Sequence, residues 1–546
     1  MPVTDFLERN VKLYGNETAL VELNPEMPET RRMTWKDYDL IQPTTDEPYR
    51  REITWTVFDE KANRFANMLL SRGIKKGDKV AILMYNCLEW LPIYFGILRS
   101  GAAAVPLNFR YLKEGILHCA RFAEVDAVVF GHHCRQHLLD LREELTDIRS
   151  FLFVGDVAAT PSFALHLADA MALQSTADPG VPLRREDLAA IYFSSGTTGA
   201  PKAVVYTHGT LESAWQLEHG NHHQVHDDCF VLIPPLYHVG GKLHWMGNLP
   251  VGARCVMLLG FQVGSFFEAA RRERISIAFL LLPWVQDILS ALESGRLDLA
   301  GYDLSAWRMV HMGAQYIPPV VVRQMRQRFP ALAYEVSYGL TESGGPGCLN
   351  LPADRMDKLG SVGVPAPGWE AKVADGEGRT VESGRTGELL LRGPGVMTGY
   401  YKNPELTAQA LRGGWLHTGD VARTDEDGFF YIVGRIKDII ISGGENVYPV
   451  QIENHLRRHP AVQDAAVFGI CDRRLGEAVV AQVELKDGAA CTEEELTRFC
   501  MDLPRFQRPK RIFLGQVPRN PTGKIDKKAL RSRYSPQNLF TDPENV

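Results

Sequence analysis

Short apolar runs that alternate with helix-like stretches limit this chain to a small set of folds. Residues 79–84 read as a buried strand, residues 89–100 as a helix and residues 102–106 as the next strand. Further strand-like runs lie downstream, at residues 127–130, 189–193, 275–280, 307–311 and 388–392. Apolar strands separated by helices favour an α/β protein with mostly parallel sheets. We therefore predict mixed, mostly parallel sheets flanked by helices over most of the length.

The length of 546 residues exceeds what one ordinary core can organise, so at least two domains are expected. After about residue 435 the pattern changes to a compact set of segments. These are helix-like at residues 451–459 and 493–502, and strand-like at residues 465–469 and 478–484. We predict a large N-terminal domain over residues 1–436 and a small, mobile α+β domain over residues 437–546. Residues 40–52, with two prolines and several charges, resemble a surface insertion.

Composition narrows the class of protein. The net charge of −6 offers no basic stripe for nucleic acid. The nine cysteines include no C-x-x-C pair, which argues against a zinc ribbon or a disulfide framework and fits a reducing compartment. The sequence shows no signal peptide at its start, no peroxisomal address at its end and no apolar run of membrane-spanning length. We expect a cytoplasmic enzyme that acts on small molecules, with its oligomeric state, a homo-oligomer included, left open.

One loop carries the strongest chemical signal. The run Tyr-Phe-Ser-Ser-Gly-Thr-Thr-Gly-Ala-Pro-Lys occupies residues 192–202, directly after an apolar strand. Glycines let a backbone approach a polyphosphate closely, and N–H groups with hydroxyls can point at its oxygens, while Lys202 adds a positive charge. The Walker pattern needs Gly-Lys followed by Ser or Thr, and this loop lacks it. Read alone, such a loop is most often a surface turn.

A second motif, Ser-Tyr-Gly-Leu-Thr-Glu-Ser at residues 337–343, combines an aromatic ring with a hydroxyl and a carboxylate. The ring of Tyr338 can lie flat against a purine, and Thr341 with Glu342 can meet phosphate and a divalent cation. A third, Trp-Leu-His-Thr-Gly-Asp at residues 415–420, precedes Gly-Arg-Ile-Lys-Asp at residues 434–438. Asp420 at a strand end can accept two ribose hydroxyls, as acidic residues do in nucleotide folds.

Three more segments complete the set. Residues 441–449 contain Gly443 and Gly444, whose backbone can pass close to a narrow ligand. Residues 518–524, Pro-Arg-Asn-Pro-Thr-Gly-Lys, end in Lys524, a position where a lone lysine is usually only solvated. Residues 233–241, Ile-Pro-Pro-Leu-Tyr-His-Val-Gly-Gly, contain His238.

In this order, the motifs resemble those of the adenylate-forming superfamily of acyl-CoA synthetases, amino-acid adenylation domains and luciferases. The resemblance covers essentially the whole chain and is closest to AMP-forming acyl-CoA synthetases. Two positions depart from the family pattern, because Ala203 stands where glycine is usual and Met312 replaces the first glycine of an adenine-lining Gly-Gly-Ala segment. Histidine at position 238, where amino-acid adenylation domains carry an aspartate, argues against amino-acid substrates.

The resemblance implies that residues 1–436 bind ATP and the acid, and that residues 437–546 carry the catalytic lysine and the CoA-tunnel loop. It implies a phosphate loop for ATP made of Ser194, Ser195, Gly196, Thr197, Thr198, Gly199 and Lys202. It further implies that Tyr338 packs on adenine beside Gly313 and Ala314, and that Thr341 contacts the α-phosphate. Glu342 and Ser194 would bind Mg²⁺, so Thr341 and Glu342 count with Lys524 as catalytic.

The remaining implied roles concern the ribose, the acid, CoA and domain motion. Asp420 and Arg435 would hold the ribose, and Lys437 would be the hinge between the domains. Gly443 and Gly444 would line the pantetheine tunnel for CoA, while Lys524 would bridge the carboxylate and the α-phosphate. The mouth of the acid pocket would be formed by His238, Gly240, Gly241 and Gly339.

We predict an AMP-forming acyl-CoA synthetase that uses ATP, Mg²⁺ and CoA. Three alternatives remain: a ligase that loads a carrier protein's phosphopantetheine, a luciferase-like oxygenase, and a catalytically inactive nucleotide-binding module. The acid is open between fatty, aromatic and polar types. Lys242 is predicted either to face solvent or to contact a polar acid, and the role of His244 is open.

Four histidines in one short segment raise the question of a metal site. His219, His222, His223 and His226 have the spacing of one helix face. Gly220 and Asn221 weaken a helix there. We interpret the run as solvated or partly buried histidines rather than as a metal site.

Overall fold

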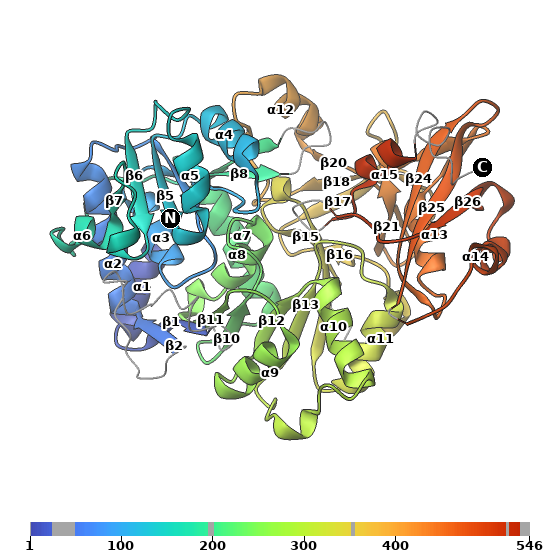
Figure 1. The fold of residues 1–546 in the computed structure, drawn as a ribbon, viewed down its shortest axis with the longest axis horizontal. Helices are drawn as coiled ribbons and strands as arrows, with labels where there is room; N and C mark the ends of the chain where they lie inside the picture. Colours follow the sequence, from blue (N-terminus) through green and yellow to red (C-terminus); the bar gives the residue numbers. More distant parts are fainter. Residues whose placement is uncertain are drawn as a thin grey trace. The chain divides into compact units, whose positions relative to one another are not determined.

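The computed structural model describes residues 2–23, 50–194, 201–350, 355–486, 488–519 and 524–534. The chain forms two compact units (Figure 1). The first comprises Met1–Ala371 and Leu391–Leu416, and the second comprises Lys372–Leu390 and His417–Val546. The boundary proposed between residues 436 and 437 lies inside the second unit, and its role as a hinge stays a prediction.

An eight-stranded sheet in the first unit carries the loop predicted to bind phosphate. In sheet order its strands are β19 (Gly399–Tyr400), β9 (Lys202–Thr207), β8 (Leu188–Ser194), β4 (Ala103–Pro106), β3 (Lys79–Leu83), β5 (Ala127–Gly131), β6 (Ser150–Val154) and β7 (Leu165–His166). Strands β8, β4, β3, β5, β6 and β7 pair in parallel, and β9 pairs antiparallel with β8 and β19. These strands read as nearly continuous apolar runs because helices cover them.

Helices on this sheet bury their apolar stripes as helical spacing requires. Ile116 of α4 (Lys113–Phe122) and Leu138 of α5 (Arg135–Leu141) pack with Val128 and Phe130 of β5. Thr54 caps the start of helix α2 (Trp55–Ser71), because its hydroxyl accepts a hydrogen bond from the Val57 N–H. Helix α2 packs against α3 (Trp90–Arg99). Other helices of this unit are α1 (Asp5–Tyr14), α6 (Leu167–Ala172) and α12 (Pro404–Ala410).

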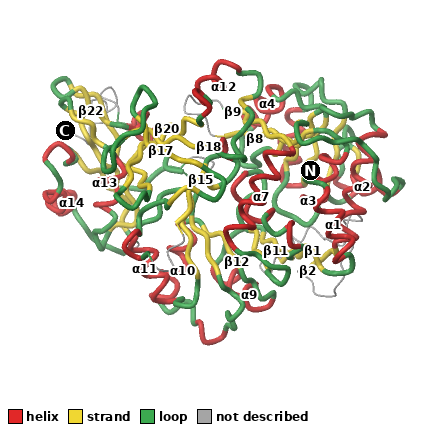
Figure 2. The backbone as a smooth tube through the Cα atoms, turned by 180° about the vertical axis from the view of Figure 1, so that it is seen from behind, coloured by secondary structure: helices red, strands yellow, loops and turns green. Residues whose placement is uncertain are grey.

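A nine-stranded sheet forms the rest of the first unit's core. In sheet order its strands are β16 (Val364–Pro365), β15 (Pro346–Asn350), β14 (Ala333–Gly339), β13 (Met309–Met312), β12 (Ile277–Leu280), β10 (Cys229–Leu232), β11 (Arg254–Leu258), β1 (Thr18–Leu23) and β2 (Arg50–Thr54). The helices α9 (Val263–Arg272), α10 (Leu282–Glu293) and α11 (Pro319–Arg328) pack on one face, and they lie beside β12 and β13 in Figure 1. Figure 2 shows α9 and α10 near β12 from behind.

Two helices connect the sheets. Helix α7 (His208–His222) contacts β8 and β9 of the eight-stranded sheet, and α8 (Val239–Met246) contacts β10 of the nine-stranded sheet. The two helices also pack on each other. Because β10, β12, β13 and β14 run in parallel, their carboxyl ends meet at one edge, where ligands bind in open α/β sheets.

The prediction of a surface insertion at residues 40–52 is wrong for residues 50–52. Residues 50–52 belong to β2, while residues 40–49 lie outside the described part of the chain. Arg51 is buried and donates to Glu89 at 2.7 Å and to Glu22 at 2.9 Å. Burial raises the pKa of Glu22 to about 7, against the opposing effect of Arg51. A charged stretch is thus predicted from sequence to lie at the surface, although its charged side chains form ion pairs in the interior.

The second unit contains most of a four-stranded sheet with the order β17 (Glu370–Ala374), β18 (Gly387–Arg392), β20 (Leu416–Thr424) and β21 (Phe430–Arg435). It also contains a five-stranded sheet made of β23 (Glu445–Val447), β22 (Ile440–Ser442), β25 (Gly476–Leu485), β24 (Val462–Asp472) and β26 (Arg511–Leu514). Helices α13 (Pro449–Leu456) and α14 (Glu493–Phe499) pack on the core built from Val467 and Ala481, and α15 (Lys527–Arg533) packs beside Phe468 and Phe513.

The predicted fold class, α/β with a large unit of mostly parallel sheets and a small α+β part, is confirmed. The predicted strands and helices appear with ends shifted by a few residues, as helix residues 89–100 show against α3 (Trp90–Arg99). Among the described residues, no helix combines the length and apolar character needed to cross a membrane.

Candidate active site

The two ends of the predicted phosphate loop lie side by side. Ser194 ends β8 and Lys202 begins β9, and the two residues are direct partners in the antiparallel ladder. The residues between them that were predicted to bind ATP lie outside the described part of the chain: Ser195, Gly196, Thr197, Thr198 and Gly199. The hairpin therefore fixes both the first hydroxyl and the final cation of the loop at one sheet end.

Glu342 joins this hairpin from 148 residues away. It lies in the short 3₁₀ turn Thr341–Ser343 that follows β14. Ser194 Oγ donates to Glu342 Oε1 at 3.2 Å, and the Tyr400 hydroxyl donates to the same oxygen at 2.9 Å. Lys202 Nζ lies 5.2 Å from the centroid of the Tyr400 ring. The structure thus brings together the two predicted Mg²⁺ ligands and the predicted phosphate cation.

Tyr400 was not predicted from sequence. Burial, and next the neighbouring Glu342 carboxylate, raise its pKa far above the ordinary value, so the hydroxyl stays protonated and remains a donor. Strand β19 is only two residues long, and no periodicity marks so short an element. Its antiparallel pairing with β9 is what brings Tyr400 next to the loop.

The oxygen donors at Glu342 fit a magnesium ion. Mg²⁺ prefers oxygen ligands and is typically held by one or two protein groups together with substrate phosphates. The Glu342 carboxylate and the Ser194 hydroxyl are of that type and already face each other. A nucleotide phosphate bound at the neighbouring loop could supply the other oxygens.

The predicted adenine-contacting residues lie at the carboxyl edge of the nine-stranded sheet. Tyr338 is half-buried near the end of β14, and Gly313 and Ala314 directly follow β13. Ala314 has φ of +63°, a left-handed conformation that is sparsely populated for a residue with a side chain. Such strain clusters at ligand sites, which makes Ala314 a candidate for a backbone held for function.

Two of the predicted ligand-lining glycines have a packing reason of their own. A Cβ on Gly313 would lie 3.2 Å from the Ser337 carbonyl oxygen. A Cβ on Gly339 would lie 2.4 Å from the Gly345 carbonyl oxygen, at an irregularity in the β14–β15 ladder. Close backbone approach therefore requires glycine at position 339 whether or not an acid contacts it.

The predicted mouth of the acid pocket surrounds the start of α8. His238 is half-buried, its N–H donates to the Pro235 carbonyl at 3.0 Å, and its ring lies 4.5 Å from that of Tyr237. Gly240 is exposed, with open space where a side chain would be. A Cβ on Gly241 would lie 2.8 Å from Pro234 Cβ, so this glycine allows the helix to pack on the preceding segment.

Lys242 does not face solvent, so that expectation is wrong. Its side chain is buried, with Nζ 3.9 Å from the ring centroid of Tyr94, 4.2 Å from that of Tyr192 and 5.0 Å from that of Trp90. Nζ has no hydrogen-bond partner in the described part of the chain. Burial lowers the pKa of Lys242 well below its ordinary value, and the three rings offer cation–π attraction in place of water. The neighbouring His244 is also buried and stacks on Phe279.

The second unit contains the predicted ribose-binding pair. Asp420 on β20 and Arg435 on β21 are direct partners in an antiparallel ladder, and Arg435 Nε donates to Asp420 Oδ1 at 2.7 Å. The Asp420 N–H donates to the Thr418 hydroxyl at 3.1 Å, and that hydroxyl donates to the Leu389 carbonyl at 2.7 Å. The carboxylate is therefore held in place by its strand neighbours.

The other predicted positions of the second unit have simpler surroundings. Gly443 and Gly444, with φ of +61° and +87°, form the two-residue turn of the β22–β23 hairpin, which by itself demands left-handed residues. Lys437 is exposed in the 3₁₀ turn Ile436–Asp438, although partial desolvation by the surrounding protein lowers its pKa. Lys524 is exposed beside the bridge between Arg519 and Ile525. Their roles in CoA binding, hinge motion and catalysis stay predictions.

The histidine run is not one helix face on the surface. Helix α7 continues through Gly220 and Asn221 to His222, and His223 ends it in a left-handed conformation. His222 is fully buried, whereas His223 is exposed. His226 Nε2 instead contacts Glu17 Oε2 at 2.8 Å. Packing of α7 against other elements overrides the weak helix propensity of its last turn.

Comparison with known proteins decides the family. The AMP-binding enzyme family matches residues 7–401, and the AMP-binding enzyme C-terminal domain matches residues 451–524. The chain belongs to the AMP-binding enzyme family. A feruloyl-CoA synthase of Amycolatopsis is 32% identical over 488 residues, which are 88% of this chain and 94% of that protein. A medium-chain fatty-acid–CoA ligase of Escherichia coli is 32% identical over 489 residues, 88% of this chain and 85% of that protein.

A solved structure agrees over nearly the full length. The ATP-bound MatB of Rhodopseudomonas palustris has a TM-score of 0.83 and 26% identity, and the match covers 98% of this chain and 100% of that one. The adenylate-forming resemblance and the predicted class, an AMP-forming acid–CoA ligase, are thereby confirmed.

Proposed function

We propose that this AMP-forming ligase activates a carboxylic acid with ATP in the presence of Mg²⁺ and transfers the acyl group to free CoA. The convergence of Ser194, Glu342 and Tyr400, with Lys202 beside them, carries the proposal. These residues come from three distant segments and combine a carboxylate, hydroxyls and a cation at one sheet end. Such a set suits a metal-bound polyphosphate rather than an apolar ligand.

The chemistry follows from the weakness of a carboxylate as an electrophile. A carboxylate oxygen attacks the α-phosphorus of ATP, the bond to the bridging oxygen breaks, and pyrophosphate leaves with its electron pair. The acyl carbon of the acyl-adenylate then has AMP as a good leaving group. The CoA thiolate adds to this carbon and AMP leaves, which gives the thioester. Positioning and charge stabilisation suffice for both steps, and no protein nucleophile is required.

The first step assigns roles to the first unit. Lys202 and the phosphate loop orient the β- and γ-phosphates, Thr341 contacts the α-phosphate, and Tyr338 packs on adenine. Glu342 and Ser194 would hold Mg²⁺, which when bound neutralises charge on the phosphates. Tyr400 keeps the Glu342 carboxylate turned toward the loop through its 2.9 Å hydrogen bond. His238 closes the mouth of the acid pocket.

The second unit contributes to both steps in the proposal. Asp420 and Arg435 hold the ribose, and Lys524 bridges the attacking carboxylate and the α-phosphate. Gly443 and Gly444 line the path of CoA. Since one arrangement of residues 437–546 cannot serve both steps, we propose that this segment turns about Lys437 between them. Lys524→Ala should then abolish acyl-adenylate formation and spare thioester formation from supplied acyl-adenylate, and equal loss of both steps would contradict this role.

The test is carboxylate-dependent pyrophosphate release across fatty, aromatic and dicarboxylic acids, each with and without CoA. Catalytic release only with CoA, together with an acyl-CoA product, supports the proposal and identifies the acid class. Release limited to about one turnover with or without CoA would point to a carrier-protein ligase. Light emission would indicate a luciferase-like oxygenase. ATP binding without turnover for any acid would indicate an inactive nucleotide-binding module.

A further inference from the structure

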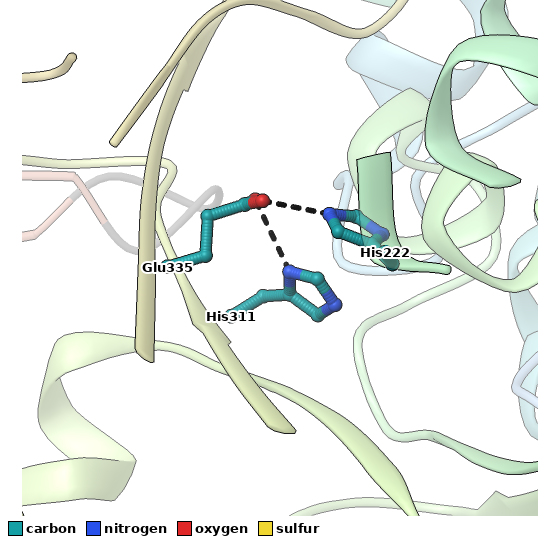
Figure 3. Close-up of side chains that lie close together, drawn as sticks. All are labelled: His222, His311 and Glu335. Carbon is teal, nitrogen blue, oxygen red and sulfur yellow. Dashed lines mark hydrogen bonds and ion pairs between the residues drawn. The ribbon is translucent and has the colours of Figure 1, made fainter. Parts of the chain in front are cut away.

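A buried cluster of two histidines and one carboxylate lies apart from the residues assigned to ATP. His311 on β13 and Glu335 on β14 are direct partners in the parallel ladder, so both side chains leave the same face of the sheet. His222, the last residue of α7, contacts the Glu335 carboxylate from the helix. Figure 3 shows the two imidazole rings converging on the Glu335 carboxylate.

The contacts within the cluster are short and completely enclosed. His222 Nε2 lies 2.7 Å from Glu335 Oε2, and His311 Nδ1 lies 3.1 Å from Glu335 Oε1. All three side chains are at most 1% exposed. One ligand atom from each residue lies within 4.8 Å of the other two. This is the size of a site in which three protein atoms share one small cation.

The chemistry of the three side chains suits a cation in this place. Burial by itself would raise the pKa of Glu335, but the two adjacent histidines hold it well below its ordinary value. Burial, and next His222, lower the pKa of His311 to about 4. Metals bind ionised carboxylates and neutral imidazole nitrogens, and here a nitrogen of each histidine already faces a carboxylate oxygen of Glu335.

We infer that His222, His311 and Glu335 bind a divalent first-row transition-metal ion, with Zn²⁺ the ion that the donor set fits best. Two imidazole nitrogens and one carboxylate oxygen are a recurrent ligand set for Zn²⁺, and they leave a fourth position for water. Imidazole donors select against Mg²⁺, which prefers oxygen. Each nitrogen now faces a different oxygen of Glu335, at 2.7 and 3.1 Å, so an ion bound to one of these oxygens would take the place of a shared proton.

The proposed ion would join three elements that sequence does not connect. It would hold the end of α7 against β13 and β14, two residues before Gly313, which directly follows β13, and two residues before Ser337 on β14. It is separate from the Mg²⁺ proposed at Glu342 and Ser194. His311 Nε2 has no hydrogen-bond partner among the described residues, whereas metal-bound histidines usually donate through their second nitrogen. We therefore expect an affinity about 10–100-fold weaker than for a fully supported site.

The test uses the full chain, purified without metal-affinity resin and without nucleotide. After treatment with a chelator, the protein is titrated with Co²⁺ as a spectroscopic probe and with Zn²⁺ in equilibrium dialysis. We expect about one ion per chain, visible absorption of tetrahedral Co²⁺, and full displacement of Co²⁺ by Zn²⁺. Millimolar Mg²⁺ should leave the Co²⁺ signal unchanged, because the donors are imidazoles.

Matched variants assign the ion to this cluster. Glu335→Gln and His311→Gln keep the size of each side chain and should weaken Zn²⁺ binding at least tenfold. His226→Gln removes a histidine that contacts a carboxylate at the surface and should bind as wild type. His208→Gln controls for the loss of a fully buried histidine outside the cluster and should also bind as wild type. Circular dichroism verifies that each variant is folded.

Three results would overturn the inference. The first is less than about one tenth of an ion per wild-type chain, which needs no variant to fold. The second is wild-type affinity in folded Glu335→Gln and His311→Gln. The third is displacement of Co²⁺ by Mg²⁺, which would place the ion at the oxygen ligands of Glu342 instead.

Discussion

Two carboxylates on one short segment, Glu335 in β14 and Glu342 just beyond it, have opposite surroundings. Glu335 is fully buried and each of its oxygens has a histidine partner. Glu342 is half-buried, and both of its hydrogen bonds from described residues go to Oε1. Because both oxygens of Glu335 have partners inside the core, we expect this residue to stabilise the fold and to act within its cluster. Partial pairing at the strand end leaves Glu342 with capacity for a ligand.

Lys242 differs from both carboxylates, because it is buried and its Nζ has no hydrogen-bond partner among the described residues. Its aromatic neighbours offset only part of the cost of taking an ammonium group out of water. The three residues thus differ in how far their contacts offset the free-energy cost of burying a charged group. Four substitutions test this difference between the residues.

The largest expected effect is on stability. Glu335→Ala leaves two buried imidazoles without their carboxylate and should lower the free energy of unfolding by about 3–5 kcal/mol, as loss of one partner of a buried ion pair does. Denaturant unfolding with a chelator present measures the effect without metal. Glu17→Ala, which removes the half-exposed partner of His226, should cost at most about 1 kcal/mol. If Glu335→Ala lowered the free energy of unfolding by less than about 1 kcal/mol, the stabilising role of Glu335 would be contradicted.

Glu342→Gln should act on catalysis instead. Loss of the charge that faces Ser194 should reduce acid-dependent pyrophosphate release about 10²–10³-fold, comparable to removal of one electrostatic group from an active site. The free energy of unfolding should change by no more than about 1 kcal/mol, because a glutamine oxygen can still accept the hydrogen bond from Tyr400. A large loss of stability with unchanged turnover would reverse the assignment of the two carboxylates.

Lys242→Met should stabilise the protein by about 1–3 kcal/mol at pH 7, because an apolar side chain replaces a buried amine that has no hydrogen-bond partner among the described residues. The pKa of Lys242 is lowered in the folded state, so the unfolded chain binds the proton more tightly. Wild-type stability should therefore rise with pH up to the ordinary lysine pKa, near 10.5, and the advantage of the variant should shrink over that range. Unfolding midpoints at pH 7 and pH 10 check both statements. An equal gain at both values would contradict the lowered pKa.

The smallest expected effect concerns the partner of Glu342. Tyr400→Phe removes the 2.9 Å hydrogen bond and keeps the ring beside Lys202, so the rate should fall about tenfold, or about 1.4 kcal/mol. Initial rates at saturating ATP and acid measure it. The doubly substituted protein with Glu342→Gln should be no slower than the Glu342→Gln protein alone. Additive losses would show that Tyr400 acts independently of Glu342.

Sequence predicts the parallel sheets and the phosphate hairpin because apolar runs and glycine-hydroxyl motifs are local signals. It could not predict the histidine–glutamate cluster. His311 and Glu335 meet only through the register of β13 and β14, and His222 lies 113 residues before Glu335. Burial of Lys242 also depends on tertiary packing, since the rings of Trp90 and Tyr192 come from separate elements. Residues 50–52 show the same limit, because charged residues read as surface until their partners are known.

The central claim is that Glu342 belongs to a site where ATP and a carboxylate form an acyl-adenylate. Exchange of labelled pyrophosphate into ATP, measured without CoA, tests it most directly because it reports the first step alone. The account predicts exchange that requires an acid, survives in His226→Gln and falls at least about 10²-fold in folded Glu342→Gln. Acid-dependent exchange of equal rate in wild type and Glu342→Gln would contradict it.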